Sequence, residues 1–239
     1  MIKEITSTSN PLIKELASLS TKEKKERNLV IIEGNDLVEL AYEKSCLDYL
    51  FVLEENSTYK DIDQYITSEA VLKKLSSNKS VPHIIGIAHI PAKNTEKGNK
   101  FIYLDGVQDP GNVGTILRTA LAFGYDGVVL SSDSASLYNE KTIQSSKGAI
   151  FKIPTYQKLS LEELKNDGYQ LIATTLQKAI DYRDVKLNDK FVIIVGNEGQ
   201  GIKESTYEIA DVTVKIPMDN IDSLNVGVAA AILLNHYRF

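Results

Sequence analysis

The stretch DGVQDPGNVGTILRTALAFG, Asp105 to Gly124, follows a short apolar run and leads into an amphipathic segment. Pro110 and Gly111 predict a turn, and Asn112 is a good N-cap for the helix that follows. The second turn of that helix carries a cation, Arg118. A strand, a glycine-containing turn, an amide and a cation in this order are typical of an anion or nucleotide site at the carboxyl end of a strand.

Apolar strand-like runs alternate with amphipathic helical segments on both sides of this stretch. The expected strands lie at 29–34, 49–53, 83–90, 101–106, 127–132, 151–154, 170–175, 190–196 and 212–217. The expected helices in the first part lie at 10–24, 36–44 and 68–77, and the last helix at 223–239. Such alternation predicts the α/β class, with a mostly parallel sheet covered by helices on both faces.

One polar segment interrupts the alternation. The sequence PAKNTEKGNK, residues 91–100, contains proline and glycine and has no apolar period, which is typical of a linker. The expected domains are therefore residues 1–92 and 101–239, joined by a linker at 93–100.

The composition is that of a globular chain that can bury a core, with 239 residues, 43% of them hydrophobic and 25% charged. No apolar run approaches a membrane span, and the first residues lack the apolar region of a signal peptide. A lone cysteine, Cys46, excludes an internal disulfide and fits a reducing cytoplasm. The three histidines, His83, His89 and His236, are scattered, so we expect no bound metal.

The net charge of −5 means that a nucleic-acid partner would have to be held by a local basic patch. The segment TKEKKER, residues 21–27, supplies one candidate: Lys22, Lys24, Lys25 and Arg27. The alternative is a solvated helix end, and the composition alone leaves both interpretations open.

Two further loops could carry chemistry. A strand ends in GNEGQG, residues 196–201, and another is followed by IPM and then by SLN, residues 223–225. GNEGQG has neither the dinucleotide spacing G-x-G-x-x-G nor the Lys-Ser/Thr of a phosphate loop. Alone, it would be a tight turn between a strand and a helix, and SLN alone would be a cap with Ser223 at the helix start.

Together and in this order, the three loops resemble the motifs of the SpoU (TrmH-like) branch of the SPOUT RNA methyltransferases. The first part of the chain, with SNPLIKEL, Arg27, IIEG and LVELA, resembles the N-terminal substrate-binding domain of that family. The resemblance implies a C-terminal α/β knot, a deep trefoil, preceded by a smaller ribosomal-protein-like α/β domain. It also implies a homodimer formed through the C-terminal domain, with S-adenosylmethionine as cofactor and RNA as substrate.

Carried over to this sequence, the family's pocket for a bent S-adenosylmethionine maps onto nine positions. They are Thr174, Gly196, Asn197, Gly199, Gly201, Ile216, Met218, Leu224 and Asn225. The three glycines would let the backbone approach the ligand and adopt positive φ.

The catalytic positions of the family fall on Asn112, Arg118, Glu198, Ser223 and Asn225. The reaction implied is methyl transfer to a ribose 2′-hydroxyl. Arg118 would be the base, or a guanidinium that stabilises the developing alkoxide or binds a neighbouring phosphate. Asn112 would orient the ribose or Arg118 from the loop before the helix.

Glu198 would order the loops, and Ser223 would hold the site together by hydrogen bonds. Ribosomal RNA is the expected substrate, because the N-terminal part resembles that of ribosomal-RNA enzymes, with transfer RNA as an alternative. A non-catalytic RNA-binding member of the same fold is a second alternative. A nucleotide-dependent oxidoreductase is a third, and the missing G-x-G-x-x-G argues against it.

Overall fold

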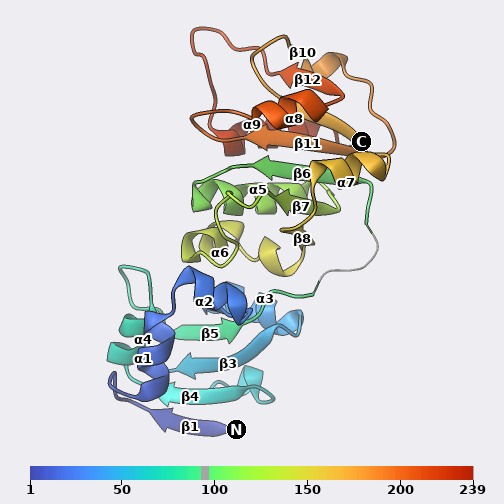
Figure 1. Ribbon diagram of the computed structural model, residues 1–239. Helices are drawn as coiled ribbons and strands as arrows, with labels where there is room; N and C mark the ends of the chain where they lie inside the picture. Colours follow the sequence, from blue (N-terminus) through green and yellow to red (C-terminus); the bar gives the residue numbers. More distant parts are fainter. Residues whose placement is uncertain (93–96, 239) are drawn as a thin grey trace.

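The computed structural model describes residues 1–92 and 97–238, which form two β-sheets with helices around them (Figure 1). The strands of the first sheet are β1 (Ile2–Ile5), β2 (Val30–Glu33), β3 (Leu47–Val52), β4 (Asp63–Thr67) and β5 (Ile84–Ala88). They are arranged in the order β1-β4-β3-β5-β2, and β5 runs antiparallel to both of its neighbours. This sheet is therefore mixed.

Helices cover both faces of the first sheet. They are α1 (Pro11–Ser18), α2 (Thr21–Glu26), α3 (Asn35–Glu43), the 3-10 turn η1 (Ser57–Tyr59) and α4 (Glu69–Leu75). Successive residues of a strand face opposite sides, so Ile31 packs towards α1 and α4 while Val30 and Ile32 pack towards α3. We call this sheet and its helices the N-terminal unit.

Two expectations for the N-terminal unit were wrong. The single helix expected over 10–24 is two helices, because Ser20 starts α2 with a capping box: its hydroxyl accepts from the Glu23 amide, and the Glu23 carboxylate accepts from the Ser20 amide. Strands β1 and β4 were not expected, because neither is a continuous apolar run.

The second sheet contains β6 (Lys100–Asp105), β7 (Gly127–Leu130), β8 (Thr155–Tyr156), β9 (Gln170–Thr174), β10 (Ile180–Asp181), β11 (Phe191–Gly196) and β12 (Val212–Lys215). Its order is β10-β12-β9-β11-β6-β7-β8, and every strand pair is parallel. The expected parallel sheet is thus confirmed. We call this sheet and its helices the C-terminal unit.

Its helices are α5 (Pro110–Ala122), α6 (Glu140–Ser146), η2 (Ala149–Phe151), α7 (Leu161–Asn166), η3 (Tyr182–Asp184), α8 (Glu204–Ile209) and α9 (Val226–His236). Apolar residues of α5 and α9 share one core cluster with one face of the sheet, and those of α7 and α8 pack on the other face. The strand expected at 151–154 was wrong: Phe151 ends η2, and only the two residues of β8 pair with β7.

In the parallel sheet, β12, β9, β11 and β6 are consecutive neighbours. Their carboxyl ends therefore lie along one edge, and the loops that follow them meet there. All three sequence motifs lie in or after these loops.

The two units are in contact through α3 and α6, which lie between the sheets (Figure 1). The buried Lys24 ammonium lies 2.6 Å from the Glu140 carboxylate, and the Tyr138 hydroxyl donates to Asn28 Oδ1 at 2.8 Å. A Cβ added to Gly148 would lie 2.1 Å from Leu40 Cδ2, so the backbone after α6 touches α3 directly. One apolar cluster includes buried residues of both units.

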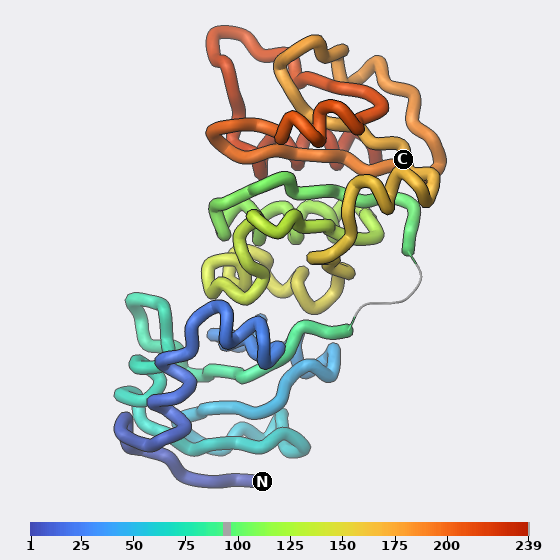
Figure 2. The backbone as a smooth tube through the Cα atoms, in the orientation of Figure 1, coloured from blue at the N-terminus to red at the C-terminus, as the bar shows by residue number. Residues whose placement is uncertain are grey.

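Figure 2 traces the backbone of both units. Residues 93–96 of the expected linker lie outside the described residues. Gly98 and Asn99 are fixed on the C-terminal unit, because the Tyr169 hydroxyl donates to the Gly98 carbonyl and the Asn99 amide donates to Asp126 at 2.7 Å. Strand β6 already begins at Lys100. None of the described helices is long and apolar enough to span a membrane.

Candidate active site

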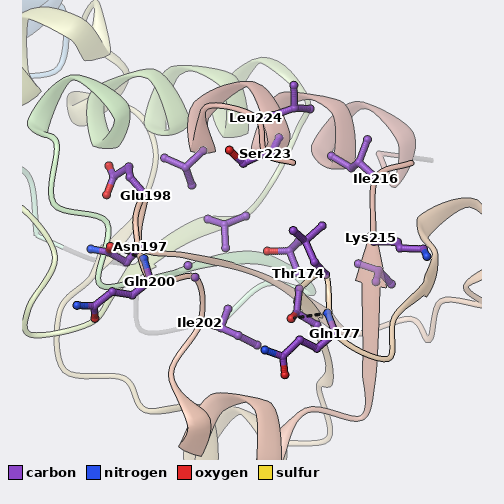
Figure 3. Close-up of a pocket in the computed structure, with 18 of the residues that line it drawn as sticks. Thr174, Gln177, Asn197, Glu198, Gln200, Ile202, Lys215, Ile216, Ser223 and Leu224 are labelled. Atoms are coloured by element: carbon purple, nitrogen blue, oxygen red, sulfur yellow. Dashed lines mark hydrogen bonds between the residues drawn. The ribbon is translucent and has the colours of Figure 1, made fainter. Parts of the chain in front are cut away.

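A pocket of about 390 Å³ lies at the carboxyl edge of the second sheet (Figure 3). Asn197, Glu198 and Gln200 line one side, and Thr174, Lys215 and Ile216 line the opposite side. Eight of the nine positions predicted for the cofactor line this pocket: Thr174, Gly196, Asn197, Gly199, Gly201, Ile216, Met218 and Leu224. The ninth, Asn225, lies in the adjoining groove between α5 and α9.

The loop after β11 is closed by its own backbone. Asn197 and Gly201 exchange two backbone hydrogen bonds of 2.8 and 3.0 Å, and the Asn197 side chain accepts from the amides of Gly199 and Gln200. A Cβ on Gly196 would lie 2.2 Å from the Gly201 carbonyl carbon, so Gly196 is required by this turn. Of the three predicted glycines, Gly201 alone has a positive φ, 74°.

Glu198 joins this loop to the start of α5. Its carboxylate accepts from the backbone amides of Gln108 and Asp109, both at 3.1 Å, and from Asn112 Nδ2 at 2.9 Å. Partial burial by itself would raise the pKa of Glu198, but these hydrogen bonds outweigh it and the pKa falls below its ordinary value. Glu198 is thus an ionised carboxylate that links the first and second motif loops.

Asn112 differs from the prediction in one respect. The N-cap of α5 is Asp109, whose carboxylate accepts from the amides of Gly111 and Asn112, and Asn112 is the third residue of the helix. Its side chain donates to Glu198 and accepts from Asn225 Nδ2 at 3.0 Å. The expected convergence on Arg118 was wrong, because Asn112 does not sit in the loop before the helix.

The third motif reaches the site through Asn225. Its Oδ1 caps α9 by accepting from the amides of Gly227 and Val228, and its Nδ2 is the group that donates to Asn112. The side chains of Asn225, Asn112 and Glu198 therefore form one hydrogen-bonded chain across the three motif loops. Ser223 precedes α9, so the helix expected from 223 begins at Val226.

Two predicted catalytic side chains are not part of this chain. Ser223 lines the pocket, is exposed and makes no hydrogen bond to any residue of 1–92 or 97–238, contrary to the expectation that it holds the site together. Arg118 is exposed on α5, lines neither the pocket nor the adjoining groove, and has no partner within the described part of the chain.

Our sequence analysis missed a second support of the pocket loop. Asp105 is buried at the end of β6, and its carboxylate accepts from the Lys203 amide at 2.9 Å and from the Thr206 hydroxyl at 2.7 Å. The Lys203 ammonium lies 3.1 Å from Asp105 and 2.8 Å from Asp133. A carboxylate directly before a glycine at a strand end was the available signal.

Asp109 is a further residue that the sequence analysis did not single out. The Lys141 ammonium lies 2.8 Å from its carboxylate and lowers its pKa below the ordinary value. The amides of Gly111 and Asn112 act in the same direction. The N-cap of the motif helix is therefore an ionised, tethered carboxylate.

The candidate RNA-binding cations do not form one exposed patch. The prediction that Lys24 contacts RNA was wrong, because its side chain is only 7% exposed and its ammonium is paired with Glu140. Lys22 and Lys25 are exposed, and Arg27 is exposed and paired with Glu15 at 2.5 Å.

The pocket has the size and chemistry expected for S-adenosylmethionine. Its apolar side chains Ile202, Ile216, Met218 and Leu224 can contact the faces of an adenine, and the backbone of the 196–201 loop offers hydrogen-bonding groups to an adenosine. Within residues 1–92 and 97–238, no group of three or more His, Cys, Asp or Glu side chains is arranged to hold a metal ion.

Comparison with known proteins places this geometry in a family. The sequence profile described as the SpoU rRNA Methylase family matches residues 99–235. The chain is similar to the 23S rRNA (guanosine(2553)-2′-O)-methyltransferase RlmP of Bacillus subtilis, with 34% identity over 99% of this chain and 100% of the relative.

Two solved structures extend the similarity to the whole chain. An AdoMet-bound rRNA methyltransferase from Sinorhizobium meliloti has a TM-score of 0.88 and 26% identity, covering 99% of this chain and 97% of that one. An RNA 2′-O ribose methyltransferase has a TM-score of 0.80 and 33% identity, covering 98% and 97%. With its three motif loops joined around one pocket, the chain belongs to the SpoU rRNA methylase family.

Proposed function

We propose that this protein transfers the methyl group of S-adenosylmethionine to a ribose 2′-hydroxyl of RNA, with ribosomal RNA as its substrate. The observation that carries the proposal is the hydrogen-bonded chain Glu198–Asn112–Asn225 beside a pocket that fits the cofactor. Two of the relatives named above are rRNA methyltransferases, one of them with bound AdoMet, and the family membership supports extending both properties to this chain.

The division of labour follows the two units. We propose that residues 1–92 are an RNA substrate-binding domain, that 93–100 are a linker and that 101–239 are the catalytic domain. Lys22, Lys25 and Arg27 are the exposed cations of α2 and its C-cap that can contact phosphates. We also propose that the catalytic domain has the deep trefoil knot of the family. Its support is the family membership and the similarity to whole SpoU structures.

When bound, S-adenosylmethionine supplies a methyl group that its sulfonium makes electrophilic. The protein must then place a ribose hydroxyl in line with that methyl and manage the hydroxyl proton. Asn112 is held on both sides by Glu198 and Asn225, so its remaining N–H and lone pair have a fixed direction for the ribose. Ser223 lines the pocket, makes no hydrogen bond within the described part of the chain and can donate to the bound molecule.

Arg118 has no partner among residues 1–92 and 97–238, so its guanidinium is available to RNA. An arginine stays protonated in ordinary surroundings, and we assign it to stabilising the developing alkoxide or to binding the phosphate beside the target ribose. Both roles require a cation and neither requires Arg118 to lose a proton.

We propose that the protein acts as a homodimer in the cytoplasm. The groove between α5 and α9 is apolar along Val228, Ala231 and Ile232, and Val228 is half exposed. A second copy covering this groove would bury that surface next to Asn112 and Asn225. Cys46 is buried and free, in keeping with a reducing compartment.

The function is tested with purified protein, radiolabelled S-adenosylmethionine and unmodified RNA in the presence of a chelator. We expect label to enter 23S ribosomal RNA but not transfer RNA, and to be recovered in dinucleotides that resist alkali because the 2′-hydroxyl is blocked. Label in transfer RNA alone would establish the transfer-RNA alternative. Binding of S-adenosylmethionine by calorimetry without transfer to any RNA would indicate a non-catalytic member.

A further inference from the structure

A polar groove of about 530 Å³ lies between the two units, at the side of α2 and α6. Its lining includes Thr21, Ser77, Asn78, Lys141 and Gln144 and the Lys24–Glu140 ion pair. Hydroxyl, amide and ammonium groups dominate this surface. We call it the interunit groove.

The wall from the N-terminal unit is held rigidly by one buried carboxylate. Glu33, at the end of β2, accepts from the Ser76 hydroxyl at 2.6 Å, from the amide and hydroxyl of Ser77 at 2.8 and 3.0 Å, and from Asn78 Nδ2 at 2.8 Å. The Lys73 ammonium holds the same loop from its other side through the carbonyls of Asn78 and Lys79. A wall ordered in advance loses little entropy when a ligand binds.

The opposite wall leads to the active site through Lys141. This side chain is 60% exposed, its ammonium lies 2.8 Å from Asp109, and its Cε lies 2.8 Å from the position that a Cβ on Gly111 would occupy. Lys141 therefore lies over the first turn of α5. The Asp109 amide donates to Glu198, which accepts from Asn112, so Lys141 is three hydrogen bonds from the proposed catalytic amide.

We infer that the interunit groove binds the RNA strand next to the target ribose, and that Lys141 contacts a phosphate of that strand. The inference rests on the proposed function and adds to it the surface that holds the substrate. Most nucleic-acid contacts go to phosphates and sugars, through Lys and Arg, hydroxyl and amide side chains, which are the groups of this groove. The groove between α5 and α9 has no charged side chain in its lining and does not fit a phosphate backbone.

The test variant is Lys141→Met, which keeps the aliphatic stem over Gly111 and removes the charge. Its matched control is Lys165→Met, since Lys165 is also an exposed lysine paired with an aspartate, Asp211 at 2.9 Å, but lies on α7 on the far face of the sheet. Affinity for unmodified 23S ribosomal RNA is measured as a function of salt, together with S-adenosylmethionine binding and the melting temperature.

We expect Lys141→Met to weaken RNA binding about tenfold and to reduce the slope of log K against log salt by about 0.7, the value for one phosphate contact to a single strand. Cofactor affinity should stay unchanged, and Lys141→Arg should keep RNA affinity near wild type. If Lys141 only holds Asp109, Lys141→Met will lower the melting temperature or kcat while RNA affinity and salt slope match wild type. That result would overturn the inference.

A second variant tests the groove without touching the helix start. The Gln144 side chain lines the groove and makes no hydrogen bond to any described residue, so Gln144→Glu adds one negative charge there with little cost to folding. We expect the RNA affinity of this variant to be lower than that of the wild type at low salt. The difference between the two proteins should narrow at high salt, because salt screens the added charge. If both Gln144→Glu and Lys141→Met bind RNA with wild-type affinity, the groove does not bind the substrate, and the proposed methyltransferase function is unaffected. If the wild type transfers no methyl group to RNA, the proposed function itself is wrong.

Discussion

Asn112 shows how hydrogen bonds of single side chains fix the geometry of the candidate active site. Its amide is fixed by Glu198 on one side and by Asn225 on the other, and each partner has a second task, Glu198 at the start of α5 and Asn225 as the cap of α9. A change at any of the three therefore alters both the site and a structural junction.

Glu198→Gln tests that coupling. A glutamine presents an N–H₂ group to one of the three donors that now face the carboxylate, so we expect a loss of about 1–3 kcal/mol in the free energy of unfolding and weaker cofactor binding. Chemical denaturation and calorimetry measure the two effects. Glu55→Gln is the control and should leave both nearly unchanged, because Glu55 is exposed, lies outside the pocket lining and makes no hydrogen bond to any described residue.

The difference in stability between wild type and Glu198→Gln should depend on pH, because the pKa of Glu198 is lowered in the folded protein. Because the folded state lowers this pKa, the carboxylate stabilises the protein above the unfolded value of about 4.3 and loses that effect as pH falls through the folded value. The difference in melting temperature between wild type and Glu198→Gln should be full at pH 7 and shrink below about pH 4.3. A difference that grows on acidification would contradict the assignment.

Arg118→Ala separates a functional arginine from an ordinary surface one. Since Arg118 has no partner among the described residues, melting temperature and cofactor affinity should be unchanged. Methyl transfer should fall at least about a hundredfold, the usual effect of losing one transition-state donor, and Arg118→Lys should restore little. Single-turnover rates within a few-fold of wild type for Arg118→Ala would show that the side chain has no part in the chemistry.

For single residues, the sequence predicted which side chains lie close together in the site. It did not predict the hydrogen bonds between them. Eight cofactor positions share one pocket, because glycine-rich and amide-rich loops after parallel strands meet at one edge. The exchange of N-cap roles between Asp109 and Asn112 could not be predicted, since both residue types cap helices well and lie three positions apart. The Lys141–Asp109 pair joins residues far apart in sequence that only packing of α5 on α6 brings together.

Among the elements, the turn after β11 has the strictest requirement. A Cβ at Gly196 would meet backbone atoms of Gly201 and Ile202 at 2.2–2.4 Å, whereas one at Gly199 would find its nearest neighbour, Asn197 Oδ1, at 3.7 Å. The sequence analysis assigned the same role to both glycines. Only at Gly196 do neighbouring backbone atoms leave no room for a side chain. Gly199 has neither a positive φ nor a close neighbour.

These two positions make a matched pair of variants. Gly196→Ala should distort the Asn197–Gly201 turn, cost about 1–3 kcal/mol of stability and weaken S-adenosylmethionine binding at least tenfold. Gly199→Ala should keep stability and affinity close to wild type. Calorimetry on both proteins decides, and equal losses in the two would mean that the glycines serve the ligand and not the turn.

The element predictions failed where the signal is short. Strands β8 and β10 have two residues each, below the length at which a period can be seen, and the apolar run at 151–154 packs as a 3-10 turn and coil. Long buried strands such as β6 and β11 were predicted within a residue, because continuous apolar runs flanked by turns have few alternatives.

On the scale of the whole molecule, the N-terminal and C-terminal units share one apolar cluster and a partly buried Lys24–Glu140 pair. The sequence indicated a linker but could not indicate this contact, since neither α3 nor α6 shows in sequence what it packs against. The proposed knot, too, depends on the order of chain crossings, which no sequence periodicity indicates.

The shared core predicts one cooperative unfolding transition for the full chain, with S-adenosylmethionine raising its midpoint as a single step. Differential scanning calorimetry measures both. Glu140→Gln, which leaves the buried Lys24 without its counter-charge, should lower the midpoint of the whole transition. Two separate transitions in the wild type, only one of them shifted by the cofactor, would contradict a shared core.

The central claim is ribose 2′-O-methylation of ribosomal RNA, and mapping 2′-O-methyl groups in cellular RNA tests it most directly. RNA from cells with the protein, without it and with Arg118→Ala in its place is compared at every nucleotide. We expect one ribosomal-RNA position to carry the methyl group in the first sample and to lack it in the other two, with transfer RNA unchanged. Identical ribosomal-RNA maps with and without the protein would contradict the account.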